Sequence, residues 1–239
     1  MTTVLLHGFW GHPQDWNQVL QALPLEIPVW IPDLYETGPL APPTPLAKWV
    51  ENFLSELERR FGAEESVQLV GYSMGARLAL NAWVREPRRF ARALLLSAAP
   101  YISSTERAER EQWEEDWSQR FLSQSWSELQ SAWQDQPVLA TSAPVERRQS
   151  DELRERLAGS LKNWSVRHHP FGIDETKALP ASVDWAFGAM DQKYSRVAKT
   201  LRELPVRGQI IRVPNAGHRL LTDAPAEIAA WIKQGKREP

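Results

Sequence analysis

The sequence predicts an α/β fold in which a mostly parallel sheet is flanked by helices. Short apolar runs alternate with amphipathic helical segments, an arrangement typical of strand–helix–strand units with right-handed crossovers. This alternation stops between about Ser103 and Phe171, where the chain is rich in Glu, Arg, Gln and Trp. We therefore expect a helical cap over residues 103–171, inserted into a core that is formed by residues 1–102 and 172–239.

Four strands and three helices are expected in the first part of the core. The strands are predicted at Thr3–Leu6, Pro28–Leu34, Ser66–Val70 and Arg92–Ala98, and the helices over Pro13–Leu23, over 46–61 and from the 71–75 turn to about Val84. The pattern is clearest between Leu46 and Phe61, where apolar residues recur at i, i+3, i+4 and i+7 on one helix face. Gly62 follows as the expected C-cap, since glycine readily adopts the conformation that ends a helix.

Strand–helix alternation resumes after the expected cap. We predict a strand at Ala181–Gly188, a helix from about Ser195, a strand at Gly208–Val213 and a last helix near Ala224–Lys233. The residues between 103 and 171 are predicted to be wholly helical. The simplest arrangement is one doubly wound sheet that this helical insertion interrupts.

Composition and net charge exclude several classes of function. The 239 residues carry a formal net charge of −2 at pH 7, which gives no bulk attraction to nucleic acid or to an anionic membrane. The chain has no cysteine, so disulfides and thiolate chemistry are excluded. Its five histidines show no metal-ligand spacing. We therefore expect no metal and no cofactor.

No targeting or membrane segment is expected. The sequence begins MTTVLLHGF, without the basic region of a signal peptide, and enters a predicted strand at once. The longest apolar stretches are of strand length and far short of a membrane span. These features predict a cytoplasmic protein without nucleic-acid or membrane partners.

The motif G-x-S-x-G is present as Gly71-Tyr72-Ser73-Met74-Gly75, between a predicted strand and a predicted helix. In this context the motif is typical of a nucleophile elbow, in which the flanking glycines relieve crowding in a tight turn. The serine then lies at a helix N-terminus, whose dipole favours developing negative charge. We interpret Ser73 as the reactive residue.

Asp191 and His218 are the expected partners of Ser73. Each lies in a loop just after a predicted strand, at the end of the sheet where α/β proteins gather their sites. The chain order Ser–Asp–His is that of α/β-hydrolases. Asp174 is the alternative acid, and a surface-loop role is the alternative for His218. The sequence thus predicts a catalytic triad on an α/β-hydrolase fold.

The oxyanion hole is predicted from two backbone N–H groups, those of Phe9 and Met74. Met74 follows the nucleophile, and Phe9 follows His7-Gly8 in the loop after the first strand. We interpret His7 as a structural hydrogen-bonding residue.

Three arginines occupy positions where a charge needs a partner. Arg77 lies one turn into the helix that begins at Ser73. Arg110 shares a helix stripe with three aromatic residues, and Arg154 lies on an apolar face. A guanidinium cannot lose its charge and is rarely buried alone. Two interpretations are open: neighbouring acidic residues neutralise these groups, or they face a cleft that binds an anion.

The elbow and the expected cap together resemble a known family. The run from Gly71 to Arg77 is similar to the elbow of the 2-succinyl-6-hydroxy-2,4-cyclohexadiene-1-carboxylate synthase family of the menaquinone and phylloquinone pathway. The cap stretches that carry the rest of the resemblance are Glu106-Arg107-Ala108-Glu109-Arg110, Trp117-Ser118-Gln119-Arg120-Phe121-Leu122 and Ala132-Trp133-Gln134-Asp135-Gln136-Pro137-Val138.

This resemblance implies a lyase that eliminates pyruvate from 2-succinyl-5-enolpyruvyl-6-hydroxy-3-cyclohexene-1-carboxylate. The positions that match the family's functional residues are Tyr72, Ser73, Arg77, Arg110, Trp133, Arg154, Asp191 and His218. The resemblance implies that the three arginines bind a small polycarboxylate and that Ser73 acts as a base. Trp133 is either a core residue or a substrate contact.

Other functions remain open on the same residues. A serine carboxylesterase or thioesterase would use the same triad through an acyl-enzyme. A carbon–carbon hydrolase acting on a carboxylate-bearing substrate is a second alternative, and a non-catalytic binding protein is a third.

Overall fold

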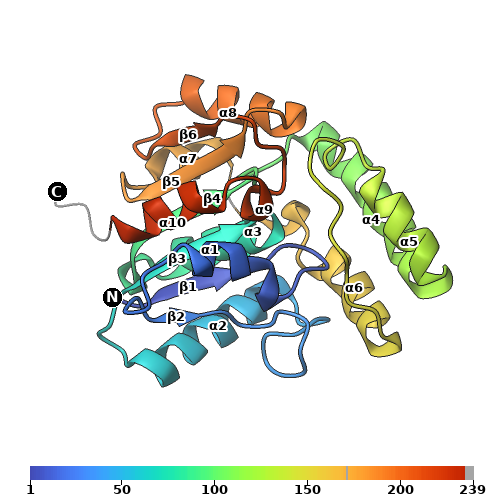
Figure 1. Cartoon of the computed structure of the whole chain (residues 1–239), viewed down its shortest axis with the longest axis horizontal. Helices are drawn as coiled ribbons and strands as arrows, with labels where there is room; N and C mark the ends of the chain where they lie inside the picture. Colours follow the sequence, from blue (N-terminus) through green and yellow to red (C-terminus); the bar gives the residue numbers. More distant parts are fainter. Residues whose placement is uncertain (171, 235–239) are drawn as a thin grey trace.

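The computed structural model describes residues 1–170 and 172–234, and within them six parallel strands form one sheet (Figure 1). The strands are β1 (Thr3–Leu6), β2 (Val29–Trp30), β3 (Val67–Tyr72), β4 (Phe90–Leu96), β5 (Val183–Gly188) and β6 (Ile210–Val213). Their order across the sheet is β2-β1-β3-β4-β5-β6, and every neighbouring pair is parallel. The predicted fold class is confirmed.

Helices cover both faces of the sheet, because successive strand residues point to opposite sides. In β4, for example, Leu95 packs in one hydrophobic core and Leu94 in the other. The first core contains side chains of α2 (Leu46–Phe61), α3 (Met74–Arg85) and α8 (Gln192–Glu203). The second contains side chains of α1 (Asn17–Gln21), α9 (Leu220–Asp223) and α10 (Pro225–Lys233).

The strand order reverses next to β1. The chain moves outward from β1 to β2, then crosses back so that β3 pairs with the other side of β1. The loops after β1 and β3 therefore diverge at their carboxyl ends, which is where parallel α/β sheets hold their ligands. The loop with Phe9 and the turn with Ser73 both lie at this point.

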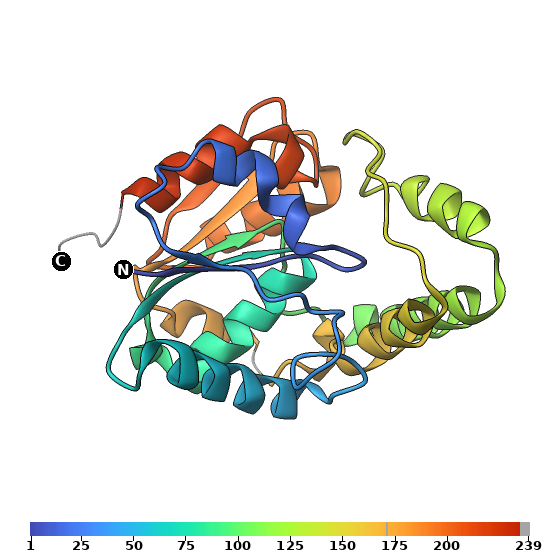
Figure 2. The same cartoon turned by 60° about the horizontal axis from the view of Figure 1, so that its bottom comes forward.

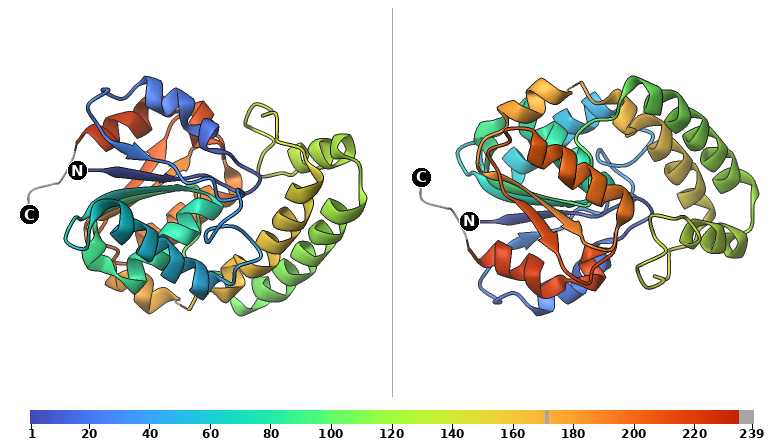
Figure 3. Two further views of the ribbon diagram at one scale, coloured as in Figure 1. Left: turned by 90° about the horizontal axis from the view of Figure 1, so that it is seen from below. Right: turned by 90° about the horizontal axis from the view of Figure 1, so that it is seen from above.

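The insertion between β4 and β5 consists of several helices. They are α4 (Ser104–Ser123), α5 (Trp126–Gln134), α6 (Asp151–Asn163), the short 3₁₀ helix η3 (Val166–His168) and α7 (Ile173–Ala178). Figures 2 and 3 show α4, α5 and α6 beyond the end of the sheet that lies opposite the N-terminus. We call residues 103–170 the inserted segment. The predicted end of a cap at residue 171 lies outside the described residues, and a separate cap domain stays a prediction.

The prediction of a wholly helical insertion is wrong between α5 and α6. Residues 136–150 form turns and irregular backbone, which we call the α5–α6 loop. Pro137 and Pro144 lie within it, and proline lacks the N–H group that a helix interior requires. Ser150 then caps α6 by accepting a hydrogen bond from the Leu153 amide at 3.2 Å.

Element boundaries in the core differ from prediction mainly at prolines. The strand expected over Pro28–Leu34 is reduced to β2, Val29–Trp30, before Pro32. The helix expected over Pro13–Leu23 is divided into a 3₁₀ turn, η1 (Pro13–Trp16), and α1; a second 3₁₀ turn, η2 (Pro87–Arg89), precedes β4. The bounds of α2 are those predicted, and Gly62 ends it with φ 83°.

Across residues 1–170 and 172–234, no helix combines the length and the apolar character that a bilayer crossing requires.

Candidate active site

Ser73 lies in the sharp turn between β3 and α3. Its φ of 52° and ψ of −110° are strained for a residue with a side chain and are held by the packed turn around it. Gly75 is required here because a Cβ atom at this position would collide with the carbonyl oxygens of Leu6 and His7 at the end of β1. The glycine of the motif therefore lets α3 begin directly against β1, with Ser73 at its N-cap.

The structure brings Ser73, Asp191 and His218 together. The Nε2 atom of His218 lies 3.2 Å from Ser73 Oγ, and its Nδ1 atom lies 2.7 Å from Asp191 Oδ2. The other oxygen of Asp191 accepts a hydrogen bond from the Tyr194 amide at 3.0 Å, since Asp191 is the N-cap of α8. A backbone hydrogen bond and an imidazole thus fix both oxygens of this carboxylate.

His218 is poised as a neutral base. Burial lowers its pKa, and the hydrogen bond and charge of Asp191 oppose that effect without overcoming it. The neutral ring donates its Nδ1 proton to Asp191, which leaves Nε2 free to accept the Ser73 hydroxyl proton. The loop itself is fixed by Ser97 Oγ, which donates to the His218 carbonyl at 2.9 Å.

The loop after β1 passes close to the nucleophile. A Cβ atom added to Gly8 would lie 2.9 Å from the Tyr72 ring and 3.5 Å from Ser73 Cβ. Within the described chain, the amides of Phe9 and Met74 have no hydrogen-bond acceptor. Met74 directly follows the serine and Phe9 directly follows Gly8, and their role as oxyanion donors stays a prediction.

His7 has the structural contacts expected from its sequence position. It is fully buried, its Nε2 atom accepts from the Leu34 amide at 3.0 Å, and its Nδ1 atom lies 3.0 Å from the Gly8 carbonyl. These bonds join the loop after β1 to the loop after β2.

A family model described as "Alpha/beta hydrolase family" matches residues 3–231. The chain belongs to the alpha/beta hydrolase family. Among curated relatives, 2-succinyl-6-hydroxy-2,4-cyclohexadiene-1-carboxylate synthases of Escherichia coli O1:K1 / APEC and of strain K12 are each 28% identical to it. Each alignment spans 97% of this chain and 92% of the relative. The resemblance noted on the elbow and the inserted segment thus extends over whole chains.

Two solved structures share this fold. MenH from S. aureus matches with a TM-score of 0.85 at 17% identity, covering 98% of this chain and 92% of that chain. Naproxen esterase from Bacillus subtilis matches with a TM-score of 0.63 at 15% identity, covering 98% and 82%.

Arg77 lies one turn into α3, the helix that begins after Ser73, and carries a charge that no described carboxylate pairs with. The residue is partly buried on α3, its Nε atom has no hydrogen-bond partner, and it forms no ion pair with a carboxylate among the described residues. Burial and the neighbouring charge of Arg110 both lower its pKa. Such a guanidinium is well placed to accept an anionic ligand.

Arg110 lies near Arg77 but has an acidic neighbour. Its Nε atom donates to Glu114 Oε1 at 2.5 Å, and its guanidinium lies 4.2 Å from the Trp113 ring centroid. Glu114 is 1% exposed and also accepts from Arg167 Nε at 2.9 Å. Arg167 Nη1 also lies 2.9 Å from Glu111, so two carboxylates pair with Arg110 and Arg167, and Arg77 is left without one among the described residues.

The structure does not bring Arg154 into this cluster, and its predicted place beside Arg77 and Arg110 is not supported. Its Nη1 atom donates to the carbonyls of Phe121 and Gln124 at 2.9 and 2.8 Å, which satisfies the end of α4. Its guanidinium lies 4.2 Å from the Trp126 ring centroid, and its Nε atom lies 3.5 Å from Asp151. Spacing on a helix face did not reveal these carbonyl partners.

Trp133 and Tyr72 line the same region from two sides. The Trp133 ring lies 4.6 Å from the Phe9 ring and 4.8 Å from the Trp117 ring, and Trp133 remains partly exposed. The Tyr72 ring lies 5.6 Å from that of His218, and burial raises the pKa of its hydroxyl. Trp133 therefore joins the inserted segment to the loop of the oxyanion donors.

Two further residues lie beside the triad but escaped the sequence analysis. Tyr194 places its ring 4.9 Å from that of His218, and Arg219 is buried directly after this histidine. The position of Tyr194 three residues after Asp191 is a signal for the first, because N-cap geometry brings residues with this spacing together. The alternative acid Asp174 is 91% exposed and contacts Lys177.

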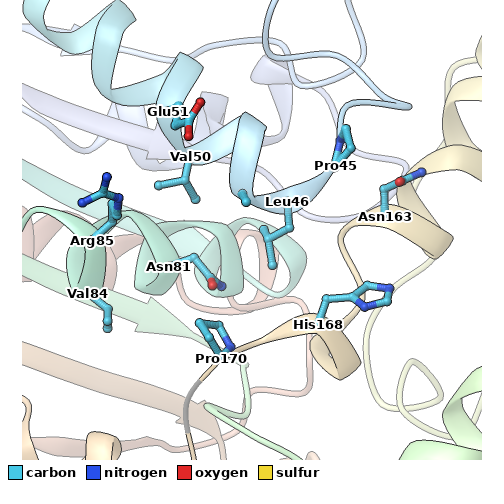
Figure 4. A pocket seen from close by; sticks show the side chains of 11 residues that line it. Pro45, Leu46, Val50, Glu51, Asn81, Val84, Arg85, Asn163, His168 and Pro170 are labelled. Atoms are coloured by element: carbon cyan, nitrogen blue, oxygen red, sulfur yellow. The ribbon is translucent and has the colours of Figure 1, made fainter.

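A cavity lies away from the triad. It measures about 640 Å³ and is lined by residues of α2, α3, α6 and η3 (Figure 4). Its polar side chains include Glu51, Asn81, Arg85, Asn163 and His168, and none of the predicted catalytic residues reaches it. Its volume would suit a binding site, but the hydrogen-bonded catalytic side chains lie at the triad.

No group of three or more histidine or acidic side chains suited to a metal ion occurs in the part of the chain that the structure describes.

Proposed function

We propose that this alpha/beta hydrolase is a lyase of menaquinone or phylloquinone biosynthesis. In this proposal it eliminates pyruvate from 2-succinyl-5-enolpyruvyl-6-hydroxy-3-cyclohexene-1-carboxylate. The observation that carries the proposal is a hydrogen-bonded Ser73–His218–Asp191 set, followed one helical turn after Ser73 by Arg77, a cation without a carboxylate partner among the described residues. The names of the 28%-identical relatives support the same reaction.

The reaction begins with proton transfer at Ser73. His218 Nε2 takes the hydroxyl proton, and the resulting alkoxide removes a proton from the substrate ring. The electrons of that C–H bond move through the ring to form the conjugated diene, and the C–O bond to the enolpyruvyl group breaks. Pyruvate leaves as its enolate, which receives the proton held by His218. The proton removed from the ring stays on Ser73 and regenerates its hydroxyl.

The remaining groups stabilise charge in this scheme. The amides of Phe9 and Met74 donate to the oxygen that gains negative charge. Asp191 holds the imidazole in the tautomer that leaves Nε2 unprotonated. Arg77 and Arg110 bind substrate carboxylates, for which planar guanidinium groups are suited. Within this proposal, residues 103–171 act as a cap that brings Arg110 and Trp133 over the serine.

The test is to incubate the protein with the enolpyruvyl substrate and follow two products together. A diene chromophore and pyruvate should appear in equal amounts, and Ser73→Ala should lower kcat by roughly a thousandfold or more. Arg85→Gln, an exposed change on the same helix as Arg77, is the control and should keep the wild-type rate. No diene from wild-type protein, or a near-normal rate in Ser73→Ala, would exclude the proposal.

A serine hydrolase is the second candidate. The 3.2 Å separation of Ser73 Oγ from His218 Nε2 also suits attack on an ester or thioester carbonyl. In that case p-nitrophenyl esters should give a burst equal to the enzyme concentration. Ester turnover with a burst, in the absence of diene formation, would favour this alternative.

A further inference from the structure

Arg219 is a buried arginine that the proposed mechanism does not use. The residue is 3% exposed and directly follows His218. Its Nη1 atom donates to the Ala143 carbonyl, its Nε atom has no hydrogen-bond partner, and it forms no ion pair within residues 1–170 and 172–234. A buried cation is costly without a counter-charge, so this position calls for an anion.

Arg147 in the α5–α6 loop brings a second positive charge beside it. Only 8% of the Arg147 side chain is exposed, and its Nη1 atom lies 3.1 Å from Asp15 Oδ2 and 3.3 Å from the Trp10 carbonyl. Its Nε atom is also buried without a partner. Burial lowers the pKa of Arg219, and the charge of Arg147 adds to that effect. Asp15 therefore neutralises one of two neighbouring guanidinium groups.

The nearby acid Asp223 is already occupied by other donors. Its Oδ2 atom accepts from Ser142 Oγ at 2.7 Å and from the Gly217 amide at 2.9 Å. These bonds join the α5–α6 loop to the loop of the catalytic histidine. They leave the Arg219 charge without direct contact to a carboxylate.

A small cavity opens onto both arginines. It measures about 60 Å³, and Arg147 and Arg219 line it together with Trp10, Gln130, Trp133 and Gln134. A cavity of this size has room for a small polar group such as a carboxylate. Trp133 also packs against Phe9 of the oxyanion loop, so the cavity adjoins the region where substrate would lie.

We propose that Arg219 and Arg147 form an anion subsite that receives one carboxylate of the substrate. This inference rests on the proposed function for the identity of the substrate. It assigns to Arg219 the third cationic role, because Arg154 binds carbonyls at the end of α4 through Nη1 and lies beside Asp151. The Tyr72 ring lies 5.6 Å from that of His218, the residue that directly precedes Arg219.

The experiment compares a dicarboxylate with its monoamide. Succinate, succinamate and pyruvate are titrated calorimetrically into the full chain, for wild type, Arg219→Gln, Arg219→Lys and the control Arg196→Gln. Arg196 is exposed and lies on α8, away from the cavity. Thermal unfolding of each variant establishes that it is folded.

We expect wild type to bind at least one carboxylate ligand, and Arg219→Gln to weaken that binding by roughly 10- to 100-fold, as the loss of a charged hydrogen bond does. If the ligand is succinate, its preference over succinamate should also disappear. Arg219→Lys should retain part of the affinity, whereas Arg196→Gln should change nothing. Loss confined to pyruvate would assign the subsite to the leaving group, and loss confined to succinate to the group that remains on the ring.

A merely structural role for Arg219 predicts a different result. A residue that only tethers Ala143 would lower the unfolding temperature while leaving the preference for succinate over succinamate unchanged. Unchanged affinities in folded Arg219→Gln would overturn the subsite, even if diene formation is observed. Conversely, failure of diene formation with the Arg219-dependent affinity intact would reject the proposed reaction and leave the anion subsite standing.

Discussion

In the proposed mechanism, Arg77 and Arg110 bind carboxylates of the substrate. Replacing either with Gln should lower kcat/KM for the polycarboxylate by roughly 10- to 100-fold, because each charged hydrogen bond contributes about 1.5–3 kcal/mol. The loss should be smaller for Arg110→Gln, since Glu114 already accepts its Nε proton. Steady-state kinetics with Arg85→Gln as the matched control measure this effect. Unchanged turnover in either variant would remove that arginine from the substrate site.

The lowered pKa of His218 sets the acid side of the pH profile. The imidazole is the base in its neutral form, so activity requires that it be unprotonated. Because burial holds its pKa below the ordinary value of about 6.5, the acid limb of the kcat/KM profile should have its midpoint below pH 6.5. A profile whose acid limb has its midpoint above pH 6.5 would contradict a buried, neutral histidine.

Some single residues could be predicted from sequence patterns, and others could not. Ser73, Asp191 and His218 were found because each follows a predicted strand, and parallel strands deliver their carboxyl ends to one edge. The apolar helix face left two interpretations of Arg154 open, and only the family resemblance placed it in the site. That face turns out to meet the end of α4, whose free carbonyls are not visible in a pattern of side chains.

The α5–α6 loop is the element whose conformation depends most on contacts with the core. Arg148 donates to Asp33 from two nitrogens, at 2.6 and 2.9 Å, and its carbonyl accepts from Trp10 Nε1 at 2.9 Å. Burial alone would raise the pKa of Asp33, but the hydrogen bonds from Arg148 and from the Tyr35 amide hold it well below its usual range. Asp33 is therefore ionised and holds this loop in place through Arg148.

Arg148→Gln should loosen that loop without unfolding the sheet. We expect faster hydrogen–deuterium exchange in residues 143–150. We also expect a higher KM, because Arg147 is adjacent to Arg148 and would become mobile with it. Lys162→Gln removes an exposed pair with Glu115 in the inserted segment and should have little effect. Equal exchange rates in wild type and Arg148→Gln would show that other contacts hold the loop.

For the molecule as a whole, buried histidines link stability to pH. Burial and the charge of Arg77 lower the pKa of His169 to about 3, and burial lowers that of His218. The unfolded chain therefore binds more protons below pH 6.5 than the folded protein does. The sign follows: the free energy of unfolding should decrease as pH falls from about 6.5, by up to about 1.4 kcal/mol per pH unit for each such group.

Urea unfolding at pH 7, 6 and 5 measures this dependence. His169→Gln should flatten the decline, while His168→Gln, a change at the exposed neighbour, should leave it as in wild type. An identical pH dependence in wild type and His169→Gln would show that His169 is not kept neutral by the fold.

The sequence by itself determined the α/β class, the elbow and the order of the triad, because strand and helix periods and short turns are local properties of the chain. It also located α2 and the insertion between β4 and β5. Only the tertiary structure decided where the arginines point. Arg77 stays without a counter-ion, Arg154 binds helix carbonyls, and Arg219 meets Arg147 across 72 positions of chain. A charge is neutralised by whatever folding places beside it, and those neighbours are distant in sequence.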